Sequence, residues 1–546
     1  MRRLGALIVA LAAAGPAAAA PVSRDVRFTA SDGVTLQATI TGTAPLAARP
    51  LIVEFSPYGR GSETFSPSPA YNALLVQIRG TGDSGGGFDA LGPRTQADAA
   101  EVLRWACGQP WSNGTLGLNG FSASAITIYN SLHLSLPCVK AAVLKSGTHE
   151  LYRDLIYPGG VSNLVPAAGV MGLIGASAVT QSPARPEMLT GLLDAGLSGL
   201  EHSTLDSWWR ERGIRGDVNH LPILMIDGFF DVESRGAFQA FQQLRGDGAH
   251  LEVVGAHDGA PKGTDGGAAD TQAWFDHYLT GAPNGIDTQP RVKLWLADGD
   301  REDDLGGRFV RVDGGDWPIP GTCWRSLALG PGGTLTRAGP ARTAIESYPQ
   351  VPSLTTNSDP YNTAIAGSAG LNGLTIALPV LSDMSVAQQL GRSYTTKPLR
   401  HTLLSAGPAS FEVRLATTAP HTSIWAVVSD VWPDGTPHPV AAGRLNSDFP
   451  DIDPDRSLRD PRTGAIVQPY GLYDRRRPAT PGQARRYRVE LWPIGNRFRA
   501  GHRIRLTVLG ASGASLPSAP GVDSITVGGR SGSRLLLPIL PRRSGS

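Results

Sequence analysis

The sequence of 546 residues has few cysteines, almost no net charge and no long hydrophobic segment beyond its N-terminus. Its three cysteines form no Cys-x-x-Cys pair and no His-Glu-x-x-His motif occurs, so we predict no metal site, no catalytic zinc and no cofactor. A net charge of +2 gives no electrostatic reason to expect a nucleic-acid partner. No later apolar run approaches the roughly 20 residues of a membrane helix, so no membrane span is expected.

The first 20 residues have the order of features found in secretory signal peptides. Arg2 and Arg3 precede an apolar run at 4–14, and small residues follow at 17–20. This succession of charged, apolar and small residues is typical of a cleaved export signal. We therefore expect residues 1–20 to be removed and the remaining chain to be exported, either to the periplasm or out of the cell.

An oxidising compartment would permit a disulfide bond. Cys107 ends a predicted helix and Cys138 begins a predicted strand, so both can lie at one edge of a sheet. A bridge between them would leave Cys323 free. The sequence leaves open whether this bridge forms.

The first half of the chain alternates short apolar strands with amphipathic helices. Residues 25–40 predict a hairpin around Ser31-Asp32-Gly33. Uninterrupted apolar runs predict buried strands, and apolar residues at helical spacing predict helices. The predicted strands are 51–55, 73–78, 116–118, 139–144, 223–226 and 251–254, and the predicted helices are 95–107, 124–132 and 273–279. This alternation predicts an α/β fold with a mostly parallel sheet and helices on both faces.

Two regions depart from this alternation. Between about residues 148 and 218 the strands stop and helix-like stretches follow, which predicts a helical cap insertion over the sheet. From residue 289 the chain is rich in glycine and proline and carries short, regularly spaced strands, typical of an all-β jelly roll or sandwich. We therefore divide the chain into a signal peptide (1–20), an α/β domain (21–288) and a C-terminal β domain (289–546).

The predicted strands of the C-terminal domain include 292–296, 410–416, 424–428, 487–491 and 504–508. The span from Asp448 to Pro481 is rich in proline, aspartate and arginine, and it is expected to be a long surface loop.

Two serine motifs compete for the role of nucleophile. Gly82-Asp83-Ser84-Gly85-Gly86 is similar to the nucleophile motif of trypsin-type proteases, but that arrangement requires its histidine and aspartate before the serine. The first histidine of this chain is His133, so we reject Ser84. Gly120-Phe121-Ser122-Ala123-Ser124 instead follows a predicted strand and opens a predicted helix, the setting of a nucleophile elbow. We predict Ser122 as the nucleophile.

The partners of Ser122 follow in the chain order of α/β-hydrolases, acid before histidine. Asp231 and His257 each come just after a predicted strand, where ligand sites of open α/β sheets lie. His257 would accept the proton of Ser122 as general base, and Asp231 would fix the imidazole and stabilise its charged form. Asp227 and Asp258 are the nearest rivals for the acid role.

Several longer motifs occur in a recognisable order. They are Ser56-Pro57-Tyr58-Gly59, Arg79-Gly80-Thr81-Gly82-Asp83-Ser84-Gly85-Gly86, Trp111-Ser112-Asn113-Gly114, Gly117-Leu118-Asn119-Gly120-Phe121-Ser122, Gly228-Phe229-Phe230-Asp231, Leu491-Trp492-Pro493 and Phe498-Arg499-Ala500-Gly501-His502-Arg503. In these motifs the chain resembles the hydrolase family typified by cocaine esterase, which is related to X-prolyl dipeptidyl peptidases and α-amino acid ester hydrolases. The resemblance implies an α/β-hydrolase domain followed by a jelly roll.

The resemblance also implies the composition of the oxyanion hole. In this family the tyrosine of the Pro-Tyr motif donates its hydroxyl beside the backbone N–H that follows the nucleophile, and here these donors are Tyr58 and Ala123. A phenol donor suits a developing oxyanion, because a charge-assisted hydrogen bond is strongest in the transition state. The chain departs from the family in having Ala123 in place of an aromatic residue and in the shortened Gly255-Ala256-His257 segment.

We therefore predict an exported serine hydrolase that cleaves a small-molecule ester, or an amide, through an acyl-enzyme. One alternative is an X-prolyl dipeptidyl peptidase or α-amino acid ester hydrolase, which would recognise a free amino group with acidic residues such as Glu54, Glu63 or Glu150. An alternative of another class is a non-catalytic protein whose β domain binds a polymer. A complete triad with an oxyanion tyrosine argues against that class, because a binding protein needs neither.

Overall fold

The computed structural model describes residues 20–62, 64–163, 187–216, 218, 221–254, 265–298, 308–350, 361, 383–510 and 518–541. Residues 1–19 of the expected signal peptide and the expected base, His257, lie outside these described residues. Among the described residues, no helix is both long enough and apolar enough to cross a bilayer.

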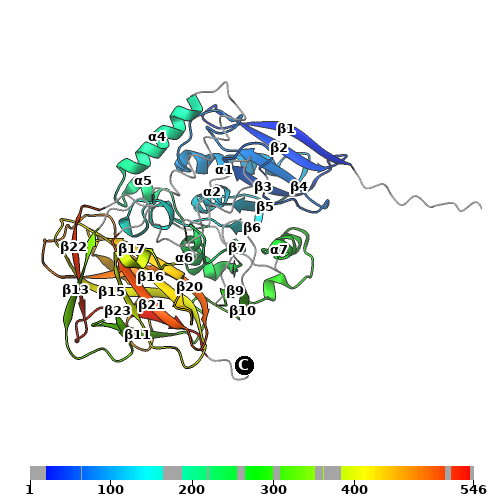
Figure 1. The fold of residues 1–546 in the computed structure, drawn as a ribbon. Coiled ribbons are helices and arrows are strands. Elements are labelled where there is room, and N and C mark those ends of the chain that lie inside the picture. The colour runs from blue at the N-terminus through cyan, green and yellow to red at the C-terminus, as the bar shows by residue number, and fades with distance from the viewer. Residues whose placement is uncertain are drawn as a thin grey trace, which may run out of the picture.

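The N-terminal half folds around a sheet whose central strands run parallel (Figure 1). Hydrogen bonding gives the order β1-β2-β4-β3-β5-β6-β7-β8-β9-β10, with antiparallel pairing at β1–β2, β2–β4 and β9–β10. The strands are β1 (Pro21–Thr29), β2 (Thr35–Thr43), β3 (Arg49–Ser56), β4 (Asn72–Gln77), β5 (Ser112–Phe121), β6 (Val139–Lys145), β7 (Ile223–Asp227), β8 (His250–Val253), β9 (Val292–Ala297) and β10 (Phe309–Gly314). The predicted hairpin and mostly parallel sheet are both present.

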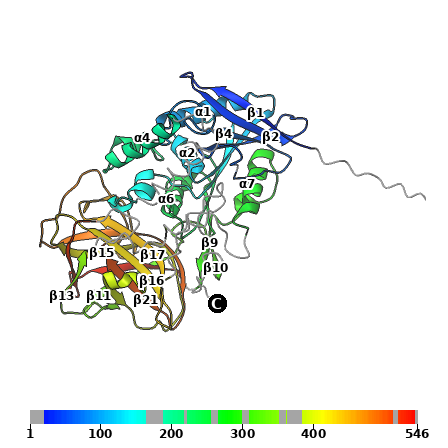
Figure 2. The same cartoon turned by 45° about the horizontal axis from the view of Figure 1, so that its top comes forward.

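Helices cover both faces of this sheet. Helices α1 (Pro93–Cys107), α2 (Ala123–Ser131) and α6 (Ser234–Leu244) share one apolar core, and α7 (Ala268–Thr280) lies over the opposite face (Figure 2). Strand β7 illustrates how the sheet contributes to both cores, since neighbouring side chains of a strand point to opposite faces. Ile223 and Met225 pack into the first core, whereas Leu224 and Ile226 pack into the core under α7.

Helix α6 is absent from the elements predicted above. Its sequence carries a usable signal, since Ala237, Phe241 and Leu244 recur at helical spacing and are all buried. The helix begins at Ser234, directly after the turn that contains Asp231, so its packing holds the C-terminal end of that turn in place.

Strand β9 is present where a strand was predicted, at 292–296, but its pairing differs from the expected one. Residues 292–296 were expected in the C-terminal β domain, but β9 pairs in parallel with β8 and extends the N-terminal sheet. Its last residue, Ala297, also pairs with Asn496 of the C-terminal part, so β9 lies where the two parts meet. The boundary at residue 288 stays a prediction.

The C-terminal part is mostly β, and its strands gather on one side of the α/β part (Figure 1). Nearly all of its strand pairs are antiparallel. The strands are β11 (Cys323–Gly330), β12 (Thr334–Thr336), β13 (Ala344–Gln350), β14 (Arg392–Thr395), β15 (Leu403–Thr417), β16 (Ser423–Val431), β17 (Pro437–Asn446), β20 (Arg485–Phe498), β21 (Arg503–Leu509), β22 (Gly521–Val527) and β23 (Arg534–Ile539). The strands predicted at 410–416, 424–428, 487–491 and 504–508 are all present.

The span 448–481 is not simply a loop, which corrects a second expectation. It contains a two-stranded sheet formed by β18 (Ile452–Arg459) and β19 (Ile466–Gly471). The guanidinium carbon of Arg153 lies 3.9 Å from the ring centre of Tyr470 in this sheet. A contact with a residue more than 300 positions away in the sequence cannot be recognised from local composition.

The region predicted as an insertion contains two short helical turns, Tyr152–Ile156 and Pro158–Gly160, and the helices α4 (Glu187–Glu201) and α5 (Ser207–Arg210). Three of its aromatic side chains are buried together, Tyr152, Tyr157 and Trp209. The ring of Tyr152 also lies 6.0 Å from that of Tyr473 in the C-terminal part. These aromatics therefore pack the junction between the insertion and the C-terminal strands.

A disulfide bond and a buried arginine each join parts of the chain that are distant in sequence. Cys107 and Cys138 form a disulfide, which ties the end of α1 to the start of β6, and Cys323 is a free thiol. Arg235 in the first turn of α6 is buried and pairs with Asp154 of the insertion and Glu490 of β20, its Nη2 lying 3.1 Å from Glu490 Oε2. One cation thus joins three parts of the molecule.

We expect Arg235→Met to destabilise the protein by about 3–5 kcal/mol, because it leaves the fully buried Asp154 and the partly buried Glu490 without their shared cation. Arg245→Met is the matched control, since Arg245 forms an exposed pair with Asp316 and exposed pairs contribute about 0–1 kcal/mol. Urea unfolding followed by circular dichroism compares the two variants. Equal effects would contradict a structural role for the buried pair.

Candidate active site

Ser122 occupies a strained turn between β5 and α2. Its φ of 53° and ψ of −125° form a conformation that residues other than glycine rarely adopt. The backbone is held by two hydrogen bonds, because Ser122 N–H donates to Lys145 O of β6 at 3.0 Å and Ile126 N–H donates to Ser122 O at 3.0 Å. This is the strand–turn–helix geometry in which a sharp elbow presents its serine.

Gly120 allows the helix to lie close to the strand. A Cβ atom at this position would be 2.7 Å from both the N and the Cα of Ala125 in α2. Real Cβ atoms do not approach backbone so closely, so any side chain here would displace the turn. The first glycine of the serine motif is therefore required by packing.

Tyr58 lies against the turn from the loop after β3. Its hydroxyl is 3.3 Å from Ser122 Oγ and 3.4 Å from the backbone nitrogen of Ala123. Ser122 and Tyr58 are only 6% and 5% exposed, so this group of donors is largely shielded from bulk water. The structure therefore brings together three of the five residues selected from the sequence.

A buried polar network supports the Tyr58 loop. Asn119 Nδ2 donates to Glu54 Oε2 and to Thr64 Oγ1, both at 2.9 Å, and Thr64 N–H donates to Glu54 Oε2 at 3.2 Å. Glu54 lies two residues before the end of β3 and Asn119 lies three residues before Ser122, so the network couples the loop to the elbow. The sequence analysis did not assign this role, although a glutamate and an asparagine within apolar strands are signals that a buried polar contact must exist.

Asp231 lies in the turn between β7 and α6 and is completely buried. Its Oδ1 accepts a hydrogen bond from Glu233 N–H at 2.8 Å. The turn also contacts the C-terminal part, since a Cβ atom added to Gly495 would overlap the ring of Phe229. Ser122 follows the carboxyl end of β5 and Asp231 follows that of β7, and both strands belong to the same parallel sheet.

His257 and Asp258 lie outside the described residues, but the stem of their segment is described. Strand β8 ends at Val253, and Val254 N–H donates to Asp227 O at 2.7 Å. The chain therefore leaves the sheet next to the strand end from which the Asp231 turn starts.

Ser84 has a structural role, because its hydroxyl bonds to the backbone of neighbouring segments. It is fully buried, donates to Gln77 O at 2.6 Å and accepts from Gln37 N–H at 2.9 Å. The hydroxyl proton and a lone pair of Ser84 thus stabilise the turn after β4, which agrees with the exclusion of Ser84 as nucleophile.

Two of the carboxylates considered for amine recognition are already engaged. Glu54 belongs to the network with Asn119 and Thr64, and Glu150 accepts from Arg153 Nη1 at 3.3 Å. Glu63 lies outside the described residues. Both described carboxylates therefore have protein partners that would compete with a substrate ammonium group.

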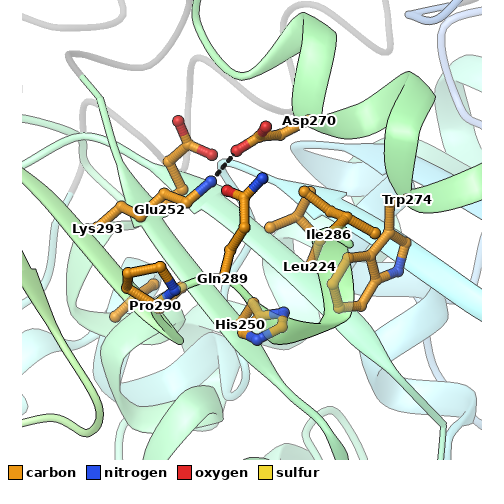
Figure 3. Close-up of a pocket in the computed structure, with 10 residues that line it drawn as sticks. Leu224, His250, Glu252, Asp270, Trp274, Ile286, Gln289, Pro290 and Lys293 are labelled. Carbon is orange, nitrogen blue, oxygen red and sulfur yellow. Dashed lines mark hydrogen bonds and ion pairs between the residues drawn. The ribbon is translucent and has the colours of Figure 1, made fainter. Parts of the chain in front are cut away.

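A small cavity lies on the α7 side of the sheet, lined by residues of β8, β9 and α7 (Figure 3). Its volume is about 10 Å³, room for a single water molecule. Lys293 and Asp270 form an ion pair in its wall, and burial together with the hydrogen bond to Asp270 raises the pKa of Glu252 to about 8. The cavity is too small for a substrate, and its charged groups support β8, the strand that leads to His257.

Two protein-family models match the chain. The first describes the X-Pro dipeptidyl-peptidase (S15 family) and matches residues 32–258, which include Ser122, Asp231 and His257. The second describes the X-Pro dipeptidyl-peptidase C-terminal non-catalytic domain and matches residues 284–532. The two matches follow each other along the chain and leave a short gap between them.

Similar proteins cover both regions. Cocaine esterase of a Rhodococcus species is 24% identical over 396 residues, which span 62% of this chain and 66% of that protein, slightly less than two thirds of its length. The crystal structure of a CocE/NonD family hydrolase from Staphylococcus aureus has a TM-score of 0.77 at 19% identity and covers 95% of this chain and 93% of that one. An α-amino acid ester hydrolase has a TM-score of 0.73 at 18% identity and covers 96% and 98%. The shared fold therefore includes an N-terminal hydrolase domain and a C-terminal mostly-β domain.

We expect Gly120→Ala to slow the labelling of Ser122 by a serine-directed phosphonate on the order of 10²-fold, the effect of misplacing a reactive group by about 1 Å. Gly246→Ala is the control, because a Cβ atom there meets nothing within 4 Å. Mass spectrometry of the labelled protein measures both rates. Unchanged labelling of Gly120→Ala would show that the turn tolerates the displacement of α2.

Proposed function

The chain belongs to the CocE/NonD serine hydrolases with X-Pro dipeptidyl-peptidase-type domains, and from this premise we propose that it hydrolyses carboxylic esters through Ser122, His257 and Asp231. The observation that carries the proposal is the position of the Tyr58 hydroxyl, which donates to Ser122 Oγ at 3.3 Å and accepts from Ala123 N–H at 3.4 Å, so that both proposed oxyanion donors lie at the nucleophile turn. Hydrogen-bond donors aimed at the position of a developing oxyanion commonly supply the largest part of catalysis in acyl transfer.

In the first half of the proposed reaction, Ser122 Oγ attacks the ester carbonyl carbon while His257 accepts the hydroxyl proton. The carbonyl oxygen becomes an oxyanion that accepts hydrogen bonds from Tyr58 O–H and Ala123 N–H. His257 then returns the proton to the leaving alcohol, and the acyl group remains on Ser122. Asp231 stabilises the imidazolium and keeps its ring oriented.

In the second half, water replaces the alcohol. His257 accepts a proton from the water, whose oxygen attacks the acyl carbon, and the same two donors stabilise the second oxyanion. The bond to Ser122 breaks, Ser122 regains its proton and the carboxylic acid leaves. In this scheme His257 accepts and donates the proton in each step, and no cofactor is needed.

Esters are proposed in preference to substrates with a free amino group. An amino-group site needs a carboxylate that points to the substrate, whereas Glu54 holds the Tyr58 loop and Glu150 is paired with Arg153. The family description nevertheless names X-Pro dipeptidyl peptidases, so cleavage of aminoacyl substrates is the second candidate. A non-catalytic polymer-binding role is not favoured, because it gives no reason for a strained serine beside two oxyanion donors.

Three finer features complete the proposal. The helices of residues 148–218 would cap the site, and the antiparallel C-terminal strands would form a jelly roll. Residues 1–20 would act as a signal peptide that exports the protein, which is supported by their sequence and agrees with the disulfide between Cys107 and Cys138.

Ser122→Ala is expected to abolish hydrolysis of a p-nitrophenyl ester series that the wild type cleaves, because the variant lacks the attacking oxygen. The same proteins are tested on aminoacyl p-nitroanilides, and chain-length preference within the ester series defines the acyl pocket. Turnover of the anilides alone would replace the esterase by the peptidase candidate. A fully active Ser122→Ala variant would refute the nucleophile.

Tyr58→Phe is expected to lower kcat by about 10²–10³-fold with little change in KM, because its hydroxyl acts on the oxyanion and not on the bound ester. Tyr71→Phe is the matched control, since the Tyr71 hydroxyl bonds Asp276 at 2.5 Å, on the α7 side of the sheet. Steady-state kinetics on one short ester compares the two variants. An equal loss in both would contradict a specific role for Tyr58.

A further inference from the structure

Two carboxyl groups share one buried site at the end of β7. Asp227 is the last residue of the strand and 2% exposed, and Asp231, in the turn that follows, is fully buried. A hydrogen bond from Asp227 to the Asp231 side chain is among the causes that raise the pKa of Asp227, after burial and the charge of Asp231. Two ionised carboxylates cannot form such a bond, because both are acceptors only, so the bond requires a proton on one of the two groups.

The remaining contacts indicate which oxygen carries this proton. Asp231 Oδ1 accepts from Glu233 N–H at 2.8 Å, and Asp227 Oδ1 accepts from Gly228 N–H at 2.7 Å. Asp227 Oδ2 is buried, and within the described part of the chain no donor reaches it. A proton on this oxygen would convert a buried acceptor without a donor into a donor for Asp231.

The surroundings favour a neutral Asp227. Burial first, and then the negative charge of Asp231, raise the pKa of Asp227 well above its usual range, although the bond from Gly228 N–H acts in the opposite direction. The other titratable groups recorded near it are Glu233 of the same turn and Tyr129 of α2, and Tyr129 is itself affected by Asp154. The negative charge of Glu233 disfavours a second charge on Asp227, whereas burial raises the pKa of Tyr129 and keeps its phenol neutral.

Asp227 also reaches the segment that leads to the proposed base. Its carbonyl oxygen accepts the hydrogen bond from Val254 N–H at 2.7 Å, three residues before His257. The backbone of Asp227 thus holds the stem of the histidine segment, while its side chain holds the proposed acid.

We propose that Asp227 is a positioning residue, protonated in the folded protein, that donates a hydrogen bond to Asp231 and keeps this carboxylate ionised and oriented for His257. The inference rests on the proposed function, which assigns Asp231 as the triad acid. It explains why two aspartates stand four residues apart at this strand end, where one acid suffices for a triad. Asp227 is then a partner of Asp231 and not its rival.

Activity tests the positioning role. Asp227→Ala removes the donor and is expected to lower kcat for a short p-nitrophenyl ester by about 10–100-fold, the range for a hydrogen bond to a charged group. Asp227→Asn keeps a neutral donor of nearly the same shape and is expected to restore most of this loss. An Asp227→Asn variant as inactive as Ser122→Ala, together with an active Asp231→Asn variant, would overturn the proposal and make Asp227 the acid.

Stability tests the protonation without relying on hydrolysis. A folded pKa above the usual 3.8 means that wild-type stability is full below that value and falls as pH rises toward the folded pKa. Asparagine does not titrate, so the melting temperature of Asp227→Asn minus that of wild type is expected to increase from pH 4.5 to pH 9. Glu252 titrates in both proteins and cancels from the difference.

The two readouts separate the possible failures. A melting-temperature difference that does not change with pH overturns the protonation of Asp227, whatever the activities are. An active Ser122→Ala variant overturns the proposed function but leaves the stability result valid. Equal kcat in Asp227→Ala and wild type, with folding confirmed by circular dichroism, overturns the positioning role.

Discussion

The strained backbone at Ser122 is the constraint on which the other features of the site depend. A residue other than glycine in such a conformation costs on the order of 1–3 kcal/mol, so neighbouring structure must hold it. Strand β6 does so through Lys145 O, and α2 does so by packing directly on Gly120. Because Tyr58 and Ala123 N–H are positioned against the same turn, relaxation of this strain would separate the serine from both donors.

Buried polar side chains connect the strands to the loops that follow them. Glu54 of β3 and Asn119 of β5 are buried, and an unpaired polar group in such a position would cost free energy. Their bonds to each other and to Thr64 reduce this cost and fix the Tyr58 loop relative to the elbow. The carboxyl edge of the sheet is therefore ordered by a few specific hydrogen bonds, in contrast to its apolar interior.

The C-terminal domain takes part in shaping the site although the family description calls it non-catalytic. Phe229 of the Asp231 turn packs on Gly495, and Arg235, four residues after Asp231, pairs with Glu490. The turn that carries the proposed acid is thus held between α6 and β20. Separating the two domains would expose Phe229 and leave buried charges unpaired, so the hydrolase domain depends on the β domain for this turn.

The sequence by itself determined the strands β3 to β8, the helices α1, α2 and α7, and the elbow at Ser122, because apolar periodicity and turn chemistry depend on residues close together in the chain. Only the tertiary structure decided that β9 joins the parallel sheet, that residues 452–471 form a hairpin against Arg153, and that Asp227 and Asp231 are both buried at the end of β7. Strand partners are distant in sequence and only folding brings them together, and the burial of two neighbouring aspartates depends on the elements that fold over them and exclude water.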